Sequence, residues 1–273
     1  MPPPTSFYSE EEQGLERDFL DRGYVVRSVC DRGALDTIRE EIVRLACAHL
    51  KCPRPNDVDR FMNNIQDVVT PADLNALRLA IFHGLNASAW LRPTYFAMAR
   101  RHLELLVGNE LAMQNRVNLS IQMPDDDSSL LPIHADVFGG ETPFQVVAWV
   151  PLVDCYRTKS MFILPREQNR KILPKMNEFR DGGMADVYEK VKDDLVWLDV
   201  PFGSVLIFST NQLHGNIVNH ERTARWSMNT RFTGLFTPYT SEERSLGSYY
   251  LPITMRPVSR IGLDYEPPGG FEE

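Results

Sequence analysis

Apolar residues follow a helical period in the first part of the chain. Between residues 35 and 49 they recur at intervals of three and four, which is the spacing of an amphipathic helix. Ser9 followed by Glu12 predicts a capping box at the start of an earlier helix, and Gly23 is placed to end that helix. We therefore expect residues 1–110 to be mainly helical and to buttress a sheet.

The period of the pattern changes to two at Arg116. Apolar and polar residues alternate over residues 117–123, which predicts a strand whose polar face carries Asn118, Ser120 and Gln122. If this face lines a cavity, Asn118 and Gln122 are candidates for hydrogen bonds to a ligand. The alternative is that the face meets water at the edge of a sheet.

A second strand with a polar face begins at Arg225. Arg225, Ser227, Asn229 and Arg231 alternate with apolar residues and with Thr230, so the four side chains share one face of the predicted strand. A core strand with an inward polar face usually lines a cavity. Arg231 is then a candidate for contact with a substrate, and a structural salt bridge is its alternative role.

Three residues between these two strands are candidate metal ligands. His134 and Asp136 are two residues apart, so on an extended backbone their side chains point to the same side. His214 follows a β-rich run at residues 205–209 and is expected to reach the metal from across a barrel or sandwich. Two imidazoles and one carboxylate can occupy one face of an octahedral ferrous ion and leave the opposite face open. The alternative for the His-x-Asp pair is a surface loop beside an ordinary core histidine.

Taken together, these motifs resemble the Fe(II)/2-oxoglutarate-dependent dioxygenases of the phytanoyl-CoA hydroxylase-like superfamily. The resemblance runs from Phe19–Val26 through His134–Asp136 to Arg225–Ser227. Residues 158–167 depart from the Pro-Gly-Ser-His turn that the superfamily often carries. This departure and the ending at residues 249–253 are more similar to the subgroup found in antibiotic-sugar and surface-carbohydrate biosynthesis.

The resemblance implies an α+β fold with a double-stranded β-helix (jelly-roll, cupin-like) core and buttressing N-terminal helices. The whole chain, residues 1–273, would form a single dioxygenase domain. Within it, residues 1–110 would be the helical buttress, and residues 111–273 the jelly-roll core with an insertion around 166–194. In the superfamily a similar spacing separates the second metal-binding histidine from the arginine. The eleven residues between His214 and Arg225 therefore favour His214 over the nearby His220, which is expected in an exposed hairpin.

The chemistry that the resemblance implies is oxidation of a C–H bond. The cofactor would be Fe(II), with 2-oxoglutarate and O2 as co-substrates and with release of succinate and CO2. The substrate would be a small molecule, such as a sugar, a nucleotide-sugar or a related natural-product intermediate. The implied site residues are the iron ligands His134, Asp136 and His214, the 2-oxoglutarate contacts Arg225, Ser227 and Gln122, and the substrate contacts Arg231 and Asn118.

Two other functions remain open at this point. One is a non-catalytic jelly-roll protein that binds a small molecule. The other is a cupin-type metalloenzyme that uses zinc or manganese without 2-oxoglutarate, which would give Arg225 no carboxylate to bind. The carboxylate of Asp136 argues against halogenation, because that reaction generally needs a small residue at the position of this ligand.

Composition narrows the class of protein further. A chain of 273 residues with 43% hydrophobic residues is long enough for one large domain. The formal net charge of -8 argues against nucleic acid as a partner, and the apolar runs are too short to cross a membrane. The four cysteines form no Cys-x-x-Cys pair and follow no recognisable leader, so we expect a reduced, cytoplasmic setting. The oligomeric state is left open.

Overall fold

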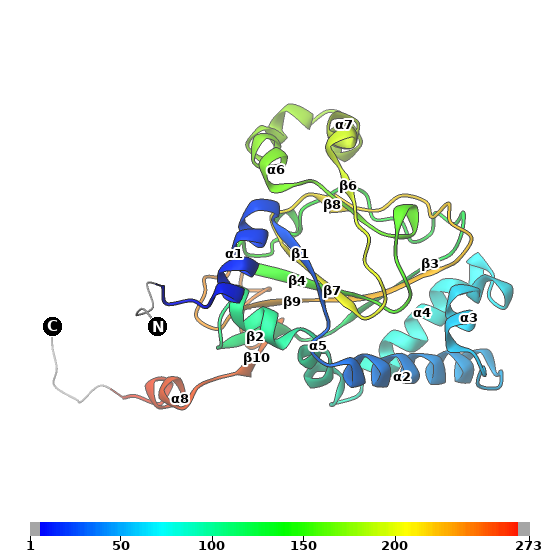
Figure 1. Cartoon of the computed structure of the whole chain (residues 1–273), viewed down its shortest axis with the longest axis horizontal. Coiled ribbons are helices and arrows are strands. Elements are labelled where there is room, and N and C mark those ends of the chain that lie inside the picture. Colours follow the sequence, from blue (N-terminus) through cyan, green and yellow to red (C-terminus); the bar gives the residue numbers. More distant parts are fainter. Residues whose placement is uncertain (1–5, 267–273) are drawn as a thin grey trace.

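The computed structural model describes residues 6–266, which form a mixture of helices and antiparallel strands (Figure 1). Helices dominate up to residue 110, as the period of the sequence predicted. They are α1 (Glu10–Arg22), α2 (Arg32–Leu50), α3 (Val58–Asn63), the 3-10 turn η1 (Ile65–Asp67), α4 (Pro71–Asn86) and α5 (Leu91–Leu106).

Local sequence signals explain how α1 begins and ends. The Ser9 hydroxyl accepts a hydrogen bond from the Glu12 backbone N–H, and the Glu12 carboxylate accepts one from the Ser9 N–H, so the predicted capping box is present. Gly23 follows with a φ of 82°, a left-handed conformation that favours glycine. The chain therefore leaves α1 and enters the first strand at once.

The helices buttress one face of the large sheet, as expected. Tyr95 of α5 is fully buried, and its hydroxyl donates toward the carbonyl oxygens of Ala148 and Met228 at 3.1 Å each. The Trp226 indole N–H donates to the Met62 carbonyl at 2.8 Å. These bonds attach the helical layer to the two central strands of the sheet, and in Figure 1 the helices α2–α5 lie along the lower side of the strands.

The large sheet has seven strands, and every pairing in it is antiparallel. Its order is β1-β7-β4-β9-β2-β10, with β3 pairing beside β2 along β9. The strands are β1 (Tyr24–Ser28), β2 (Leu111–Gln114), β3 (Asn118–Gln122), β4 (Gln145–Pro151), β7 (Ser204–Ser209), β9 (Arg225–Gly234) and β10 (Tyr250–Thr254). The strands predicted from alternation near residues 117 and 225 correspond to β3 and β9.

A smaller sheet of three strands carries part of the site. It has the order β6-β5-β8, with β5 (Phe162–Ile163) between β6 (Val196–Trp197) and β8 (His214–Gly215). Between β5 and β6 the chain is helical over residues 166–194, the segment in which an insertion was expected; that it is an insertion relative to the superfamily stays a prediction. The elements of this segment are α6 (Arg166–Ile172), η4 (Leu173–Phe179), α7 (Gly183–Val191) and η5 (Lys192–Asp194).

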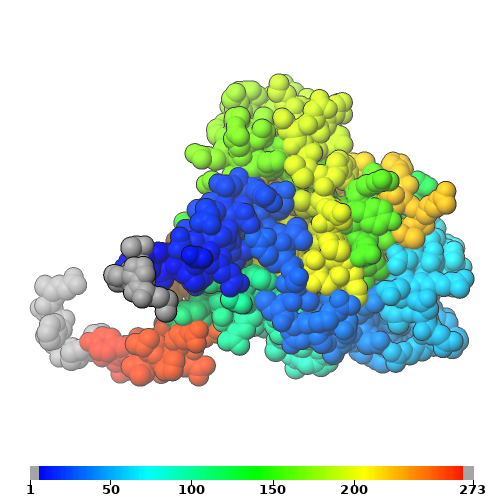
Figure 2. Space-filling model, in the orientation of Figure 1, coloured from blue at the N-terminus to red at the C-terminus, as the bar shows by residue number. Residues whose placement is uncertain are grey.

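Helix α7 packs on the small sheet through the aromatic side chain of Tyr188. Phe162 of β5 is buried and meets the rings of Tyr188 and Trp197 at centroid distances of 5.6 and 5.4 Å. Figure 2 shows residues 166–194 as a protrusion on one side of the molecule. The last helix, α8 (Pro257–Leu263), lies beyond β10 at the opposite end. Within residues 6–266, no helix combines the length and the apolar character that crossing a bilayer requires.

Candidate active site

The two candidate histidines lie side by side on neighbouring segments. His134 and His214 form an antiparallel bridge in which each backbone N–H donates to the carbonyl oxygen of the other at 2.9 Å. Their rings consequently lie on the same side, with centroids 4.3 Å apart. The expectation that His214 would reach the site from across the fold was wrong, because direct pairing of the two segments already brings the rings together.

Asp136 joins the two histidines through an extended residue. Ala135 has φ -116° and ψ 139°, so the side chains of His134 and Asp136 project to the same side, as the two-residue spacing predicted. Asp136 itself begins the 3-10 turn η2 (Asp136–Gly139) and is buried. One ligand atom from each of the three residues can be chosen so that all lie within 4.8 Å of one another.

The backbone selects which histidine nitrogens face the site. His134 Nδ1 lies 2.8 Å from the Pro132 carbonyl, and His214 Nδ1 lies 2.9 Å from the Gln212 carbonyl. A carbonyl can only accept, so each Nδ1 carries the proton and donates. In the neutral tautomers both Nε2 lone pairs are then available to a metal. Burial, together with the nearby His134, lowers the pKa of His214 to about 4, which keeps this imidazole neutral at neutral pH.

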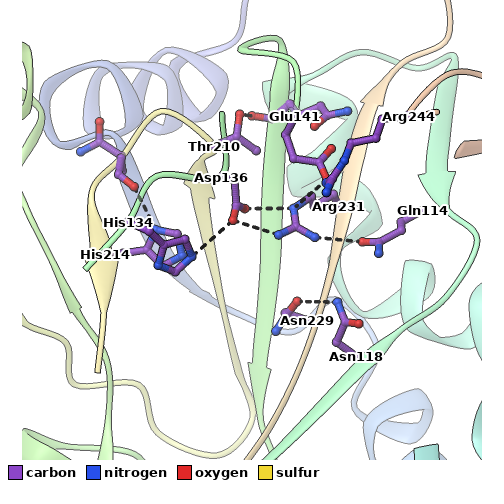
Figure 3. Close-up of polar contacts among 12 residues, drawn as sticks. Gln114, Asn118, His134, Asp136, Glu141, Thr210, His214, Asn229, Arg231 and Arg244 are labelled. Carbon is purple, nitrogen blue, oxygen red and sulfur yellow. Dashed lines mark hydrogen bonds and ion pairs between the residues drawn. The ribbon is translucent and has the colours of Figure 1, made fainter. Parts of the chain in front are cut away.

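The Asp136 carboxylate is held on its other side by Arg231. The guanidinium donates from Nε to Oδ2 and from Nη2 to Oδ1, both at 2.9 Å (Figure 3). Burial acts to raise the pKa of the Asp136 carboxyl, but the charge of Arg231 and its two hydrogen bonds outweigh this effect and hold the pKa well below its ordinary value. Asp136 is therefore ionised across the range in which the protein would work.

The polar face of β9 lines the cavity onto which these residues open. The cavity has a volume of about 270 Å³. The four alternating residues predicted to share one face all contribute to its wall. From β9 these are Arg225, Ser227, Asn229 and Arg231, joined by His134, Asp136, His214, Asn118, Ser120, Ser129, Leu131, Val147, Trp149, Met161, Phe208, Gly215 and Asn216. The large and small sheets therefore face each other across one shared cavity.

Arg225 is a buried cation at the other end of this face. Its Nη1 donates to the Ser160 carbonyl at 3.2 Å and its Nη2 donates to the Ser120 hydroxyl at 3.3 Å. Within the part of the chain that the structure describes, it forms no ion pair, and the buried Arg225 Nε and Ser227 Oγ have no hydrogen-bond partner. Burial lowers the pKa of Arg225 to about 10. The guanidinium remains charged, and its surroundings leave a carboxylate-binding donor group unused.

Of the other residues predicted to contact a ligand, some line the cavity and others do not. Asn118 lines the cavity and donates from Nδ2 to Asn229 Oδ1 at 3.1 Å. Gln122 is buried opposite Arg225 in the β3–β9 register, but it donates to the Ile217 carbonyl and does not line the cavity. Contact between Gln122 and 2-oxoglutarate stays a prediction. Arg231 takes part in the ion pair that was its alternative role, and contact with a substrate stays a prediction as well.

His220 lies apart from the three candidate ligands. Its Nδ1 is 3.1 Å from Asp125 Oδ1, and both side chains are more than half exposed. The geometry thus brings His214, and not its neighbour in sequence, next to His134. This agrees with the exposed hairpin expected for His220.

Several residues of the site were not singled out from the sequence. Ser120 contacts Arg225, and its place between Asn118 and Gln122 in the alternating pattern could have indicated it. Glu141 could not be found in this way, because it belongs to a loop without a period. It lies 3.8 Å from Arg231 Nε and also contacts Arg244 and Tyr250.

Comparison with known proteins finds similarity in fold to solved structures. No protein-family model matches the sequence, and no curated protein matches it. Solved structures do match. The non-heme alpha ketoglutarate dependent carbocyclase SnoK from nogalamycin biosynthesis is 15% identical in sequence. The match covers 93% of this chain and 100% of that one, with a TM-score of 0.53.

Two further structures contain bound metal. The epimerase SnoN, in complex with Fe3+, alpha ketoglutarate and nogalamycin RO, is 17% identical. The match covers 96% of this chain and 92% of SnoN, with a TM-score of 0.51. HygX from Streptomyces hygroscopicus, with nickel and 2-oxoglutarate bound, is 15% identical, with coverages of 85% and 89% and a TM-score of 0.51. At these identities the similarity is one of fold, shared with SnoK and SnoN, two non-heme alpha ketoglutarate dependent enzymes from nogalamycin biosynthesis, and with HygX.

Proposed function

We propose that this chain is an Fe(II)/2-oxoglutarate-dependent oxygenase of the phytanoyl-CoA hydroxylase-like superfamily, with a double-stranded β-helix core formed as one domain. It would oxidise a C–H bond of a small natural-product intermediate, such as a sugar or nucleotide-sugar. The observation that carries the proposal is the placement of Arg225. This buried cation without a carboxylate partner among the described residues lines the same cavity as the His134, Asp136 and His214 cluster.

The donor set of the cluster fits ferrous iron. Two neutral imidazoles with free Nε2 atoms and one ionised carboxylate are the ligands of a facial site, which suits non-haem iron and leaves positions for other ligands. His134, Asp136 and His214 would hold the metal. The bound nickel of HygX and the Fe3+ of SnoN, two proteins that share this fold, support that reading.

The unpaired polar atoms at the other end fit a dicarboxylate. Buried Arg225 Nε and Ser227 Oγ have no partner within residues 6–266, and a carboxylate can accept from both. Such a contact would also compensate the desolvated charge of Arg225. We infer that Arg225 and Ser227 bind the distal carboxylate of 2-oxoglutarate, with Gln122 close behind them on β3.

The chain's residues define what the site contributes to the reaction. When bound, iron with 2-oxoglutarate supplies the activation of dioxygen that couples decarboxylation to succinate with oxidation of a C–H bond. Arg225 and Ser227 orient the co-substrate from one end of the cavity. The apolar side chains of Trp149, Met161 and Phe208 exclude water from the middle of the cavity, and a substrate must then lie against what remains of the wall.

Asn118 and Asn229 are the proposed substrate contacts on that wall. Their mutual hydrogen bond leaves the carbonyl oxygen of Asn118 as an acceptor and the amide N–H of Asn229 as a donor. A neighbouring acceptor and donor match a hydroxyl or amide group, as a sugar-like substrate would present. Ser120, Ser129 and Leu131 also line an adjoining groove against α4, so a substrate larger than the cavity has room to extend.

Oxygen-dependent turnover tests the proposal. Protein loaded with ferrous iron should convert 2-oxoglutarate to succinate in the presence of O2, and a panel of sugars, nucleotide-sugars and glycosylated natural products should include a compound that accelerates this conversion. His214→Ala should abolish iron binding and succinate formation, whereas the matched variant His220→Ala should retain both. Metal binding without succinate formation would favour a binding protein or a metalloenzyme that does not use 2-oxoglutarate.

All four cysteines are unpaired in the structure. This supports the reduced, cytoplasmic setting that we propose for the enzyme.

A further inference from the structure

Arg231 binds both oxygens of the Asp136 carboxylate, and this geometry limits how Asp136 can bind a metal. The two N–H groups of the Arg231 fork reach different oxygens of the carboxylate, at 2.9 Å each. When two N–H groups of one guanidinium bind the two oxygens of a carboxylate, each oxygen accepts through the lone pair that points toward the guanidinium. Those are also the lone pairs that a metal needs in order to bind both oxygens of one carboxylate. While the fork is in place, Asp136 can offer a metal only one oxygen.

Arg231 also contacts two other side chains, and these contacts favour the same orientation of its guanidinium. Its Nη1 donates to Gln114 Oε1 at 3.2 Å, and Glu141 Oε1 lies 3.8 Å from Nε. Glu141 is 1% exposed and is fixed in turn by the Arg244 guanidinium and by the Tyr250 hydroxyl. Figure 3 shows the resulting chain of contacts leading away from the histidines, from Asp136 through Arg231 to Gln114 on one side and Glu141 on the other.

The charges of the four ionised side chains in this series of contacts balance. Asp136 and Glu141 contribute two carboxylates, and Arg231 and Arg244 contribute two guanidiniums. A lysine at position 231 would preserve the charge but would present a single ammonium group, which cannot donate in the planar, two-pronged geometry of arginine. What distinguishes arginine here is therefore the geometry of its contact with Asp136, in addition to its charge.

We propose that Arg231 is a positioning residue that restricts Asp136 to one-oxygen ligation of the metal. In a six-coordinate ion, three protein ligands with one donor atom each leave three positions for other ligands. If Asp136 bound through both oxygens, one of those three positions would be lost. Arg231 thus keeps the site open for a chelating co-substrate and dioxygen. This inference rests on the proposed function only in requiring that the His134, Asp136 and His214 cluster binds a metal.

Water bound to Mn2+ provides a direct readout. Manganese favours six oxygen and nitrogen ligands, and the proton relaxation rate of water reports how many water molecules are bound to each protein-held ion. The measurement would compare the wild-type protein with Arg231→Met, Arg231→Lys and Arg244→Met, each saturated with Mn2+ and without 2-oxoglutarate. Arg244→Met is the matched control, because it removes a partly exposed guanidinium from the same series of contacts but removes neither of the two hydrogen bonds from Arg231 to Asp136.

We expect the relaxivity per bound Mn2+ to fall by about one third in Arg231→Met and Arg231→Lys, as one of three open positions is lost. It should stay at the wild-type value in Arg244→Met. A purely structural role for Arg231 would lower thermal stability but leave this relaxivity unchanged. If Arg231→Met fails to fold, Arg231→Lys alone decides the matter.

Two results would overturn the inference while leaving the metal site intact. One is wild-type relaxivity in the folded Arg231 variants, and the other is loss of Mn2+ binding from them, since the fork would then be needed for binding itself. Failure of the wild-type protein to bind Mn2+ in a manner that depends on His214 would overturn the proposed metal site as well. The failure of the positioning role and the failure of the proposed function are thereby distinguishable.

Discussion

Two arginines on one face of β9 have opposite surroundings. Arg231 lies at one end of the cavity and pairs with two buried carboxylates, those of Asp136 and Glu141. Arg225 lies six residues earlier on the same face, is more deeply buried, and has only a hydroxyl and a carbonyl as acceptors. Burial lowers the pKa of both guanidiniums, but the carboxylates reverse that effect for Arg231 and leave its pKa raised.

The difference separates a cation whose charge is paired within the fold from a cation whose charge is available to a ligand. A buried charge with its partners in place belongs to the fold, and its removal leaves the partner charge unpaired. A buried charge without a partner costs the fold free energy and is retained where a ligand supplies the opposite charge. The two ends of β9 should consequently respond in opposite ways when the arginine is removed.

The largest effect on stability is expected for Arg231→Met. The substitution leaves Asp136 and Glu141 buried without the guanidinium, so the free energy of unfolding of the metal-free protein should fall by about 3–5 kcal/mol. Chemical denaturation of the metal-free protein measures this value. The double variant Asp136→Asn with Arg231→Met should recover much of the loss, and a decrease of less than about 1 kcal/mol in the single variant would show that the pair is not structural.

The next largest effect is on 2-oxoglutarate binding. The substitution that weakens this binding is expected to raise the stability of the metal-free protein, whereas Arg231→Met lowers it. Arg225→Met should raise the 2-oxoglutarate concentration needed for half-maximal turnover by about 100-fold, since charged hydrogen bonds contribute roughly 3 kcal/mol. The same variant should be more stable than wild type when metal-free, by about 1 kcal/mol, because the cost of burying an unpaired cation exceeds that of the two hydrogen bonds lost.

Arg225→Lys serves as the control for charge without the fork, and it should lie between wild type and Arg225→Met in 2-oxoglutarate requirement. Affinity for Mn2+ alone should be the same in all three proteins. A large destabilisation of Arg225→Met would place Arg225 with Arg231 as a structural residue and remove the distinction between the two ends of β9.

A smaller effect should appear in the pH dependence of stability near the histidine pair. The pKa of His214 is about 4 in the folded protein, below its ordinary value of 6.5. Between those two values the unfolded chain binds a proton that the folded chain does not, so the free energy of unfolding falls as the pH is lowered from 6.5 to 4. The slope contributed by one such group is at most about 1.4 kcal/mol per pH unit.

Denaturation of metal-free protein at a series of pH values checks this effect. His214→Asn should flatten the profile in that window, and the exposed His220→Asn should leave it unchanged. An identical flattening in both variants would contradict the assignment of the slope to the buried imidazole.

The smallest change is expected at Ser227. Its buried hydroxyl is unpaired among the described residues and adjoins Arg225 on the face of β9, so Ser227→Ala should raise the 2-oxoglutarate requirement only about fivefold, corresponding to about 1 kcal/mol for one neutral hydrogen bond. Titration of both Ser227→Ala and Arg225→Met ranks the two contacts. A larger effect from Ser227→Ala than from Arg225→Met would reverse the proposed division of roles.

The sequence predicted the parts of the site that lie on periodic segments. Alternation places Arg225 and Arg231 on one face of β9, and an extended backbone at Ala135 sets His134 and Asp136 on one side. These features depend only on the geometry of a strand, which repeats every two residues. Residues on regular elements can therefore be assigned to a face without knowledge of the fold.

Contacts between segments that are distant in the sequence could not be predicted from its periodicity. Glu141 lies in a loop, and its contact with Arg244 joins positions more than one hundred residues apart, so no period connects them. The direct pairing of His134 with His214 likewise depends on how two short segments meet. The role of Arg231 could be narrowed only when its distance to Asp136 was known, because the same position on β9 suits a substrate contact and a salt bridge equally well.

Anaerobic titration with 2-oxoglutarate tests the central claim most directly. Protein loaded with ferrous iron should develop the weak visible charge-transfer band of the 2-oxoglutarate chelate, and the band should require far more 2-oxoglutarate in Arg225→Met than in wild type. If the wild-type protein binds iron through His134, Asp136 and His214 but no band forms at any 2-oxoglutarate concentration, the assignment of Arg225 as the co-substrate's partner is contradicted.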